Sequence, residues 1–208
     1  MAKFAVTRFA SGNGKSPAQA RTALGATDTV DWGALPTPVG TLLNFVSGPG
    51  GVARQVAFKS MSGLDGSITH PLDLVRLTQG AIGGWVGNFP KREALLFTND
   101  RPPPVTDPLK ESIVIHFSQP IRGVGLQFQG STAAASTTLR FKANLILWNL
   151  DNSDWGQPDH AVGSASDGSA VFLGAVAADP VVSTVQLYVD AMNGQQIDLA
   201  IGRISLVT

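Results

Sequence analysis

Short stretches in which apolar and polar residues alternate recur along the chain from Thr27 onward. A repeat of two residues is the period of a β-strand that buries one face. Gly, Pro, Asn and Asp occupy most of the intervals, and these residues favour turns. The pattern predicts strands at residues 29–32, 42–47, 52–59, 94–98, 112–117, 123–129, 138–148, 170–177, 184–190 and 197–207.

Each of the longer predicted strands has one apolar face and one polar face. In 123–129, Val124, Leu126 and Phe128 share a face, and Gln127 and Gln129 lie on the other. Strands with this division bury their apolar faces against a second sheet. Because the connections are short and no helix of crossover length follows a strand, antiparallel pairing is expected. We therefore predict an all-β, antiparallel, jelly-roll-like β-sandwich.

The last predicted strand changes phase by one residue. Leu199 and Ile201 share the inward phase, which then continues at Ile204 and Leu206. Gly202 sits at the change, and a single inserted residue is the signature of a β-bulge. The sequence therefore predicts a bulge at Gly202.

One short helix is expected near the N-terminus, at residues 16–25. Ser16 can cap it, Pro17 suits its first position, and Gly25 can take the left-handed conformation that ends it. Such a short helix needs support from a sheet. We predict that residues 1–26 pack on one sandwich domain formed by 27–208. Within it, 60–93 is ambiguous, and 71–77 suits either a short helix or a strand.

Composition narrows the classes of function. The 15 basic and 15 acidic residues balance, which argues against nucleic acid as a partner. Only 14% of residues are charged, against roughly 25% in an ordinary domain. A surface built from Ser, Thr, Asn and Gln suits an exported protein or a subunit of an assembly. No stretch is long and apolar enough to predict a membrane span, and no signal peptide is recognisable at the start.

No catalytic constellation is evident. The sequence has no cysteine, its histidines at 70, 116 and 160 lie in different contexts, and no Gly-x-Ser-x-Gly motif occurs. We expect no catalytic residues and hence a protein that is not an enzyme. A hydrolase remains the least favoured alternative, since it requires a cleft with two carboxylates roughly 5–10 Å apart.

An oxygen-rich cluster follows the strand predicted at 138–148. Asp151, Asp154 and Asp159 are candidate calcium ligands, with Asn152 among them. Calcium takes six to eight oxygen ligands, often from Asp and Asn in a loop. Such clusters are also ordinary turn chemistry between strands. No other cofactor is expected.

Three tryptophans suggest a ligand surface. Trp148 and Trp155 flank the cluster, and Trp85 lies in a glycine-rich segment. Flat aromatic rings beside amides such as Asn152 are typical of sugar binding, where stacking combines with directed hydrogen bonds. The other interpretation is that these rings cover the ends of the sandwich.

The order of several short motifs resembles a group of secreted bacterial proteins. They are Val-Asp-Trp-Gly-Ala-Leu-Pro at 30–36, Gly-Trp-Val-Gly-Asn-Phe-Pro at 84–90, and the apolar segments 94–98, 117–129, 172–176 and 197–204. The chain is similar over about 27–208 to jelly-roll-like domains of PEP-CTERM proteins, many of which carry a C-terminal Pro-Glu-Pro sorting signal. The resemblance implies a jelly roll in an extracellular or cell-surface protein. It implies no catalytic residues.

These observations favour a non-catalytic extracellular or surface binding module. Its expected partner is a glycan or another protein surface. The alternative is a structural subunit of a surface layer, particle or fibre, which would form homo-oligomers.

Overall fold

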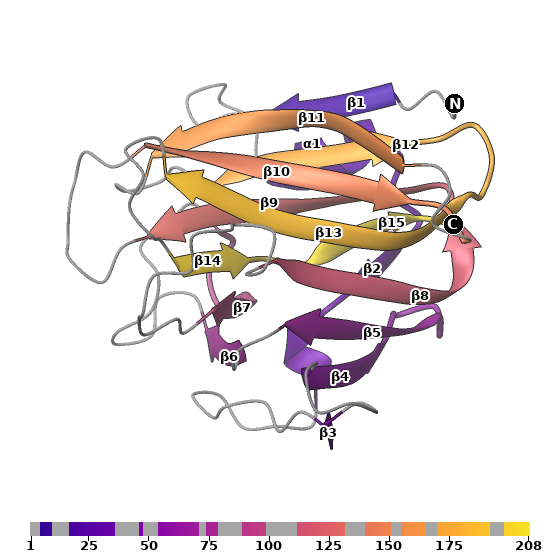
Figure 1. Ribbon diagram of the computed structural model, residues 1–208, viewed down its shortest axis with the longest axis horizontal. Helices are drawn as coiled ribbons and strands as arrows, with labels where there is room; N and C mark the ends of the chain where they lie inside the picture. Colours follow the sequence, from indigo (N-terminus) through magenta and orange to yellow (C-terminus); the bar gives the residue numbers. More distant parts are fainter. Residues whose placement is uncertain are drawn as a thin grey trace.

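The computed structural model describes residues 5–9, 17–35, 46–47, 54–70, 74–78, 89–98, 112–131, 140–150, 155–164, 170–191 and 198–208. Within these ranges the chain forms two antiparallel sheets that face each other (Figure 1). The predicted all-β sandwich with one short helix is confirmed.

The first sheet, sheet A, has strand β9 near its centre. Eight strands belong to it among the described residues. Their order is β1 (Ala5–Phe9), β12 (Val171–Val176), β9 (Gly123–Ser131), β14 (Asp198–Ile201), β7 (Ala94–Thr98) and β6 (Leu74–Thr78), with β15 (Ile204–Val207) beside β9 and β2 (Asp28–Val30) beside β15.

The second sheet, sheet B, contains seven strands among the described residues. Their order is β11 (Trp155–Ser164), β10 (Arg140–Trp148), β13 (Val182–Ala191), β8 (Ile113–Ile121), β5 (Asp65–His70), β4 (Arg54–Lys59) and β3 (Val46–Ser47). The chain passes from sheet B to sheet A and back several times between β8 and β14, as in Greek-key and jelly-roll sandwiches.

The core lies between the sheets and consists of the apolar faces that alternation predicts. Ile113 and Ile115 of β8 are fully buried against it, as are Val124, Leu126 and Phe128 of β9. His116, on the opposite phase of β8, is exposed. The inward residues of β10, β13, β14 and β15 that the structure describes join the same cluster. The predicted phases of these strands are therefore confirmed.

Four described strands escaped prediction. β5 and β6 lie in the ambiguous range 60–93, and within the segment 71–77, which suits either a helix or a strand, residues 74–77 belong to strand β6. β1 and β11 occupy segments where no strand was expected. β11 contains Pro158, which cannot donate to a ladder, but β11 is the terminal strand of sheet B and its register with β10 shifts beside Pro158. The prediction from alternating apolar and polar residues did not find β11, because a proline and a bulge interrupt the alternation.

The predicted bulge at Gly202 is confirmed by strand pairing. Ile201 of β14 pairs with Phe128, and Ser205 of β15 pairs with Gly125. Between these pairs, three residues of the closing segment lie opposite two residues of β9, which is one extra residue. The Gly202 N–H donates to the Gln127 carbonyl at 3.1 Å. The bulge residue thus still bonds to β9, while the neighbour on the other side of the closing segment changes from β7 to β2.

Helix α1 (Pro17–Leu24) packs on the outer face of sheet A. Gly25 follows with φ +75°, and the N–H groups of Gly25 and Ala26 donate to the carbonyls of Thr22 and Arg21. This pair of bonds is the Schellman arrangement, so the predicted glycine stop is confirmed. Leu24 is buried on the sheet with Phe172 and Val207.

Two facing glycines make room for Leu24. Gly125 of β9 and Gly174 of β12 are register partners. A Cβ on Gly125 would lie 2.8 Å from Leu24 Cδ2, and a Cβ on Gly174 would lie 2.9 Å from Leu24 Cδ1. Contacts this short require the Leu24 side chain, the helix or the sheet to shift. The glycine pair therefore sets how closely α1 approaches sheet A.

Gly174→Ala is expected to destabilise the protein by about 1–3 kcal/mol, because the added methyl group meets both Leu24 and the β9 backbone. Urea unfolding measures the change, with Ser118→Ala on the exposed phase of β8 as the control. In the double variant Leu24→Ala with Gly174→Ala, the two penalties should be less than additive. Full additivity would show that Leu24 does not sit over this glycine pair.

Asp28 links the two sheets. This β2 carboxylate accepts hydrogen bonds from the N–H and hydroxyl of Ser62, in the turn between β4 and β5, and from the N–H of Thr29. Burial alone would raise the pKa of Asp28, but these bonds together with that of Ser60 outweigh it, and the pKa lies below its ordinary value of 3.8. The ionised carboxylate therefore stabilises the fold.

Because the folded-state pKa is lowered, this stabilisation is present above about pH 4 and is lost as the pH falls through the folded-state value. Asp28→Asn should lower the free energy of unfolding by about 1–3 kcal/mol at pH 7, since one of the two oxygens that accept these hydrogen bonds is lost. The difference from the unmodified protein should shrink on acidification, in urea unfolding between pH 7 and pH 2.5. Asp179→Asn, at an exposed turn, serves as the control. A constant difference across this range would contradict the assignment.

Candidate functional site

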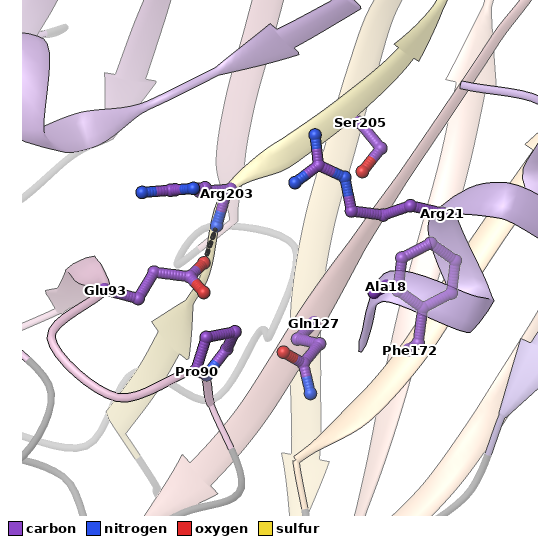
Figure 2. Close-up of a pocket in the computed structure, with 8 residues that line it drawn as sticks. All are labelled: Ala18, Arg21, Pro90, Glu93, Gln127, Phe172, Arg203 and Ser205. Carbon is purple, nitrogen blue, oxygen red and sulfur yellow. Dashed lines mark hydrogen bonds between the residues drawn. The ribbon is translucent and has the colours of Figure 1, made fainter. Parts of the chain in front are cut away.

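A pocket opens on the outer face of sheet A, between α1 and the turn that precedes β7. Its volume is about 120 Å³. Figure 2 shows Arg21 and Phe172 on one side, Glu93 and Pro90 on the other, and Gln127 between them. Arg203, Ser205 and Ala18 complete the lining. The lining combines charged, amide, hydroxyl and apolar groups from segments far apart in the sequence.

The pocket exists because the outer face of sheet A is covered. Gln127 and Gln129 lie on that face, as alternation predicts, but they are only 6% and 1% exposed. The polar face of β9 therefore points away from the core, as predicted, but it is covered rather than exposed to solvent. Helix α1 covers one part of the face, and Phe89 covers another with Leu95 of β7. The pocket is the interval between these two covers.

The bulge holds a carboxylate in place. The N–H of Arg203 donates to Glu93 Oε1 at 2.5 Å. A Cβ at position 202 would approach Glu93 Oε1 to 2.8 Å, so glycine gives the carboxylate access to this N–H. The Arg203 guanidinium forms an ion pair with Asp31 at 2.8 Å. One residue thus engages both carboxylates, through its backbone and its side chain.

Glu93 is buried in this position. Its desolvation is the largest influence and raises the pKa of Glu93 above its ordinary value of 4.5. The Arg203 N–H, and the charges of Arg203 and Arg21, oppose the shift, whereas the charge of Asp31 adds to it. Glu93 Oε2 has no hydrogen-bond partner among the described residues, which leaves one carboxylate oxygen available to a ligand.

Arg21 extends from α1 over the other side of the pocket. One guanidinium nitrogen donates to the Thr29 hydroxyl of β2. No ion pair joins Arg21 to a carboxylate within the part of the chain that the structure describes. The hydroxyl fixes one end of the guanidinium, and the remaining N–H groups keep their capacity to donate.

Ser205 contributes a buried hydroxyl. The residue is 1% exposed, and its Oγ has no partner among the residues described. Leaving a buried polar group unsatisfied costs about 1–3 kcal/mol. The side-chain amide of Gln127 likewise forms no hydrogen bond to the described residues. Two groups that can both donate and accept hydrogen bonds therefore border the pocket without partners among the described residues.

Two carboxylates, those of Asp31 and Glu93, lie beside the pocket and both contact Arg203. Asp31 pairs with the Arg203 guanidinium and Glu93 accepts from the Arg203 N–H, so each carboxylate has a structural partner. Of the described residues, none form a group of three or more potential metal ligands. His116 lies on the exposed face of sheet B, with its Nδ1 3.0 Å from the Thr184 hydroxyl. It takes no part in the pocket.

The candidates from the sequence fall elsewhere. Trp148 and Trp155 are register partners at the ends of β10 and β11, which places these two positions together. Asp159 lies within β11 opposite Leu145, so the expected oxygen-rich loop ends before it. The remaining candidates, Trp85, Asp151, Asn152 and Asp154, lie outside the described residues.

Sequence reasoning missed the residues of the pocket. Two signals pointed toward it: the phase change at Gly202, next to Arg203, and the run of glutamines on one phase of β9. Neither signal identifies Arg21 or Glu93, because their approach to β9 depends on how α1 and the turn before β7 fold onto the sheet.

Comparison with protein-family models, curated proteins and solved structures finds no match to this chain. Across the described ranges, no helix has the length and apolar character needed to cross a membrane.

Glu93→Gln should become more stable relative to the unmodified protein as the pH rises from 4 to 8. The pKa of Glu93 in the folded state lies above 4.5, so ionisation in the buried site costs stability as the pH rises through that range. Glutamine keeps an acceptor for the Arg203 N–H. Glu93→Ala removes this acceptor and should lower the free energy of unfolding by about 1–3 kcal/mol at pH 4 and at pH 8. Urea unfolding at each pH tests this, and a pH-independent difference for Glu93→Gln would refute it.

Proposed function

We propose that this protein is a non-catalytic binding module and that the pocket between α1 and the Pro90–Glu93 turn is its ligand site. The proposed ligand is a sugar unit, and the proposed location is the cell surface or the extracellular space, as the resemblance of the sequence motifs implies. The observation that carries the proposal is the convergence of Arg21, Glu93 and Gln127 around one pocket.

The chemistry of the pocket supports a ligand rich in hydroxyl groups. A sugar hydroxyl both donates and accepts hydrogen bonds, and so do the Gln127 amide and the Ser205 hydroxyl. Glu93 Oε2 accepts and Arg21 donates. Pro90 and Phe172 supply apolar surface for the carbon skeleton. A few directed polar groups on an apolar wall are the usual composition of a small-molecule site.

The pocket is also held rigidly. Its polar groups come from β9, β15 and α1, and the backbone of the bulge positions Glu93. Side chains set on regular elements lose less freedom when a ligand binds than side chains on long loops. This preorganisation supports recognition of a small ligand.

A glycan array followed by calorimetry tests the proposal, with and without calcium because the Asp151 and Asp154 prediction is open. Gln127→Leu should weaken binding of the selected sugar by about tenfold or more, since an amide that bonds the ligand is replaced by a side chain of similar size. Gln119→Leu, at an exposed position of β8, is the matched control.

Absence of binding to any glycan under both conditions would refute the function. A ligand whose binding is abolished by Trp148→Ala and unaffected by Gln127→Leu would move the site to the paired tryptophan positions of β10 and β11.

A further inference from the structure

We propose that the pocket selects a ligand that carries a carboxylate next to a hydroxyl group, as in a sugar acid, and that Arg21 binds the carboxylate. The inference rests on the proposed function of this pocket and specifies the class of ligand. Sugar acids and free hydroxy acids share this chemistry.

The distribution of charges singles out Arg21. The guanidinium of Arg203 is already neutralised by Asp31, at 2.8 Å. Arg21 is held only by the Thr29 hydroxyl and has no carboxylate partner among the described residues. A guanidinium binds a carboxylate through two parallel N–H donors, and these charge-assisted bonds are stronger than neutral ones. Arg21 is therefore the cation with free capacity for an anionic ligand.

The opposite side of the pocket suits the hydroxyl group. Figure 2 shows the Glu93 carboxylate across the pocket from the Arg21 side chain. Its Oε1 accepts a hydrogen bond from the Arg203 N–H, so Oε2 is left to accept a hydrogen bond from the ligand hydroxyl. The Ser205 hydroxyl, which has no partner among the described residues, and the Gln127 amide also line the pocket. One ligand with a carboxylate at one end and a hydroxyl at the other can bond to the Arg21, Glu93, Ser205 and Gln127 side chains.

The size of the pocket limits the ligand. A volume of about 120 Å³ corresponds to roughly ten water-sized positions. This accommodates a small acid or the terminal unit of a longer glycan. An extended chain of sugars exceeds it.

The charged groups around Glu93 make binding depend on pH. Arg21 from α1, Arg203 from the bulge and Asp31 before η1 (Trp32–Ala34) all act on it, and burial raises its pKa. An ionised Glu93 repels the ligand carboxylate, whereas a protonated Glu93 donates a hydrogen bond. Affinity should therefore increase as the pH falls from 8 toward 5, while the ligand remains ionised.

Calorimetry of the full chain with glucuronate, gluconate, glycolate and glucose tests the inference. Glucuronate should bind at least tenfold more tightly than glucose at pH 6. Arg21→Met should remove that preference, and Arg21→Lys should retain part of it because the charge stays while the paired donors are lost. Arg122→Met removes an exposed arginine at the β8–β9 turn and should change nothing. Glu93→Gln should flatten the pH dependence.

Thermal unfolding by circular dichroism verifies that each variant is folded. Equal binding of glucose and glucuronate, both unaffected by Arg21→Met, would overturn this inference and leave the sugar-binding function standing. Binding of gluconate or glycolate with no binding of glucuronate would support the acid-binding pocket and overturn its role in sugar recognition. Absence of binding by all four ligands would overturn the inference for this pocket.

Discussion

Strand β9 is buried on both of its faces, and the rest of sheet A is organised around that constraint. Every residue from Gly123 to Gly130 is buried. The inner face meets the sandwich core, but the outer face carries glycines and glutamines, which cannot form a second apolar core. Backbone partners come from β12 on one side and from β14 and β15 on the other. Something must cover the outer face while satisfying its polar groups.

Two apolar covers shield parts of this face in different ways. Helix α1 lies close to the sheet because Gly125 and Gly174 leave a hollow for Leu24. Phe89 forms a separate apolar contact with Leu95 and Ala200. The covers do not meet, and the pocket lies between them over Gln127. The same packing that shields the sheet therefore leaves the open pocket proposed as the ligand site.

The bulge at Gly202 contributes both to the strand pairing of sheet A and to the geometry of the pocket. The extra residue lets the closing segment pair first with β9 and β7 and then with β9 and β2. It also turns the Arg203 N–H toward Glu93. The Gly202 carbonyl accepts a hydrogen bond from Trp32 Nε1 at 2.9 Å. A single backbone irregularity thus anchors a buried tryptophan on one side and positions a buried carboxylate on the other.

The sequence by itself determined the features that depend on neighbouring residues. The alternation in 123–129 assigned the inward face of β9, the phase change placed the bulge at Gly202, and Gly25 marked the end of α1, because each follows from local backbone geometry. Only the tertiary structure decided that Gln127 and Gln129 are buried, that Asp159 belongs to a strand, and that Arg21 and Glu93 border one pocket. Those outcomes depend on contacts between segments distant in the chain, and the period of a strand shows which way a side chain points without showing what covers it.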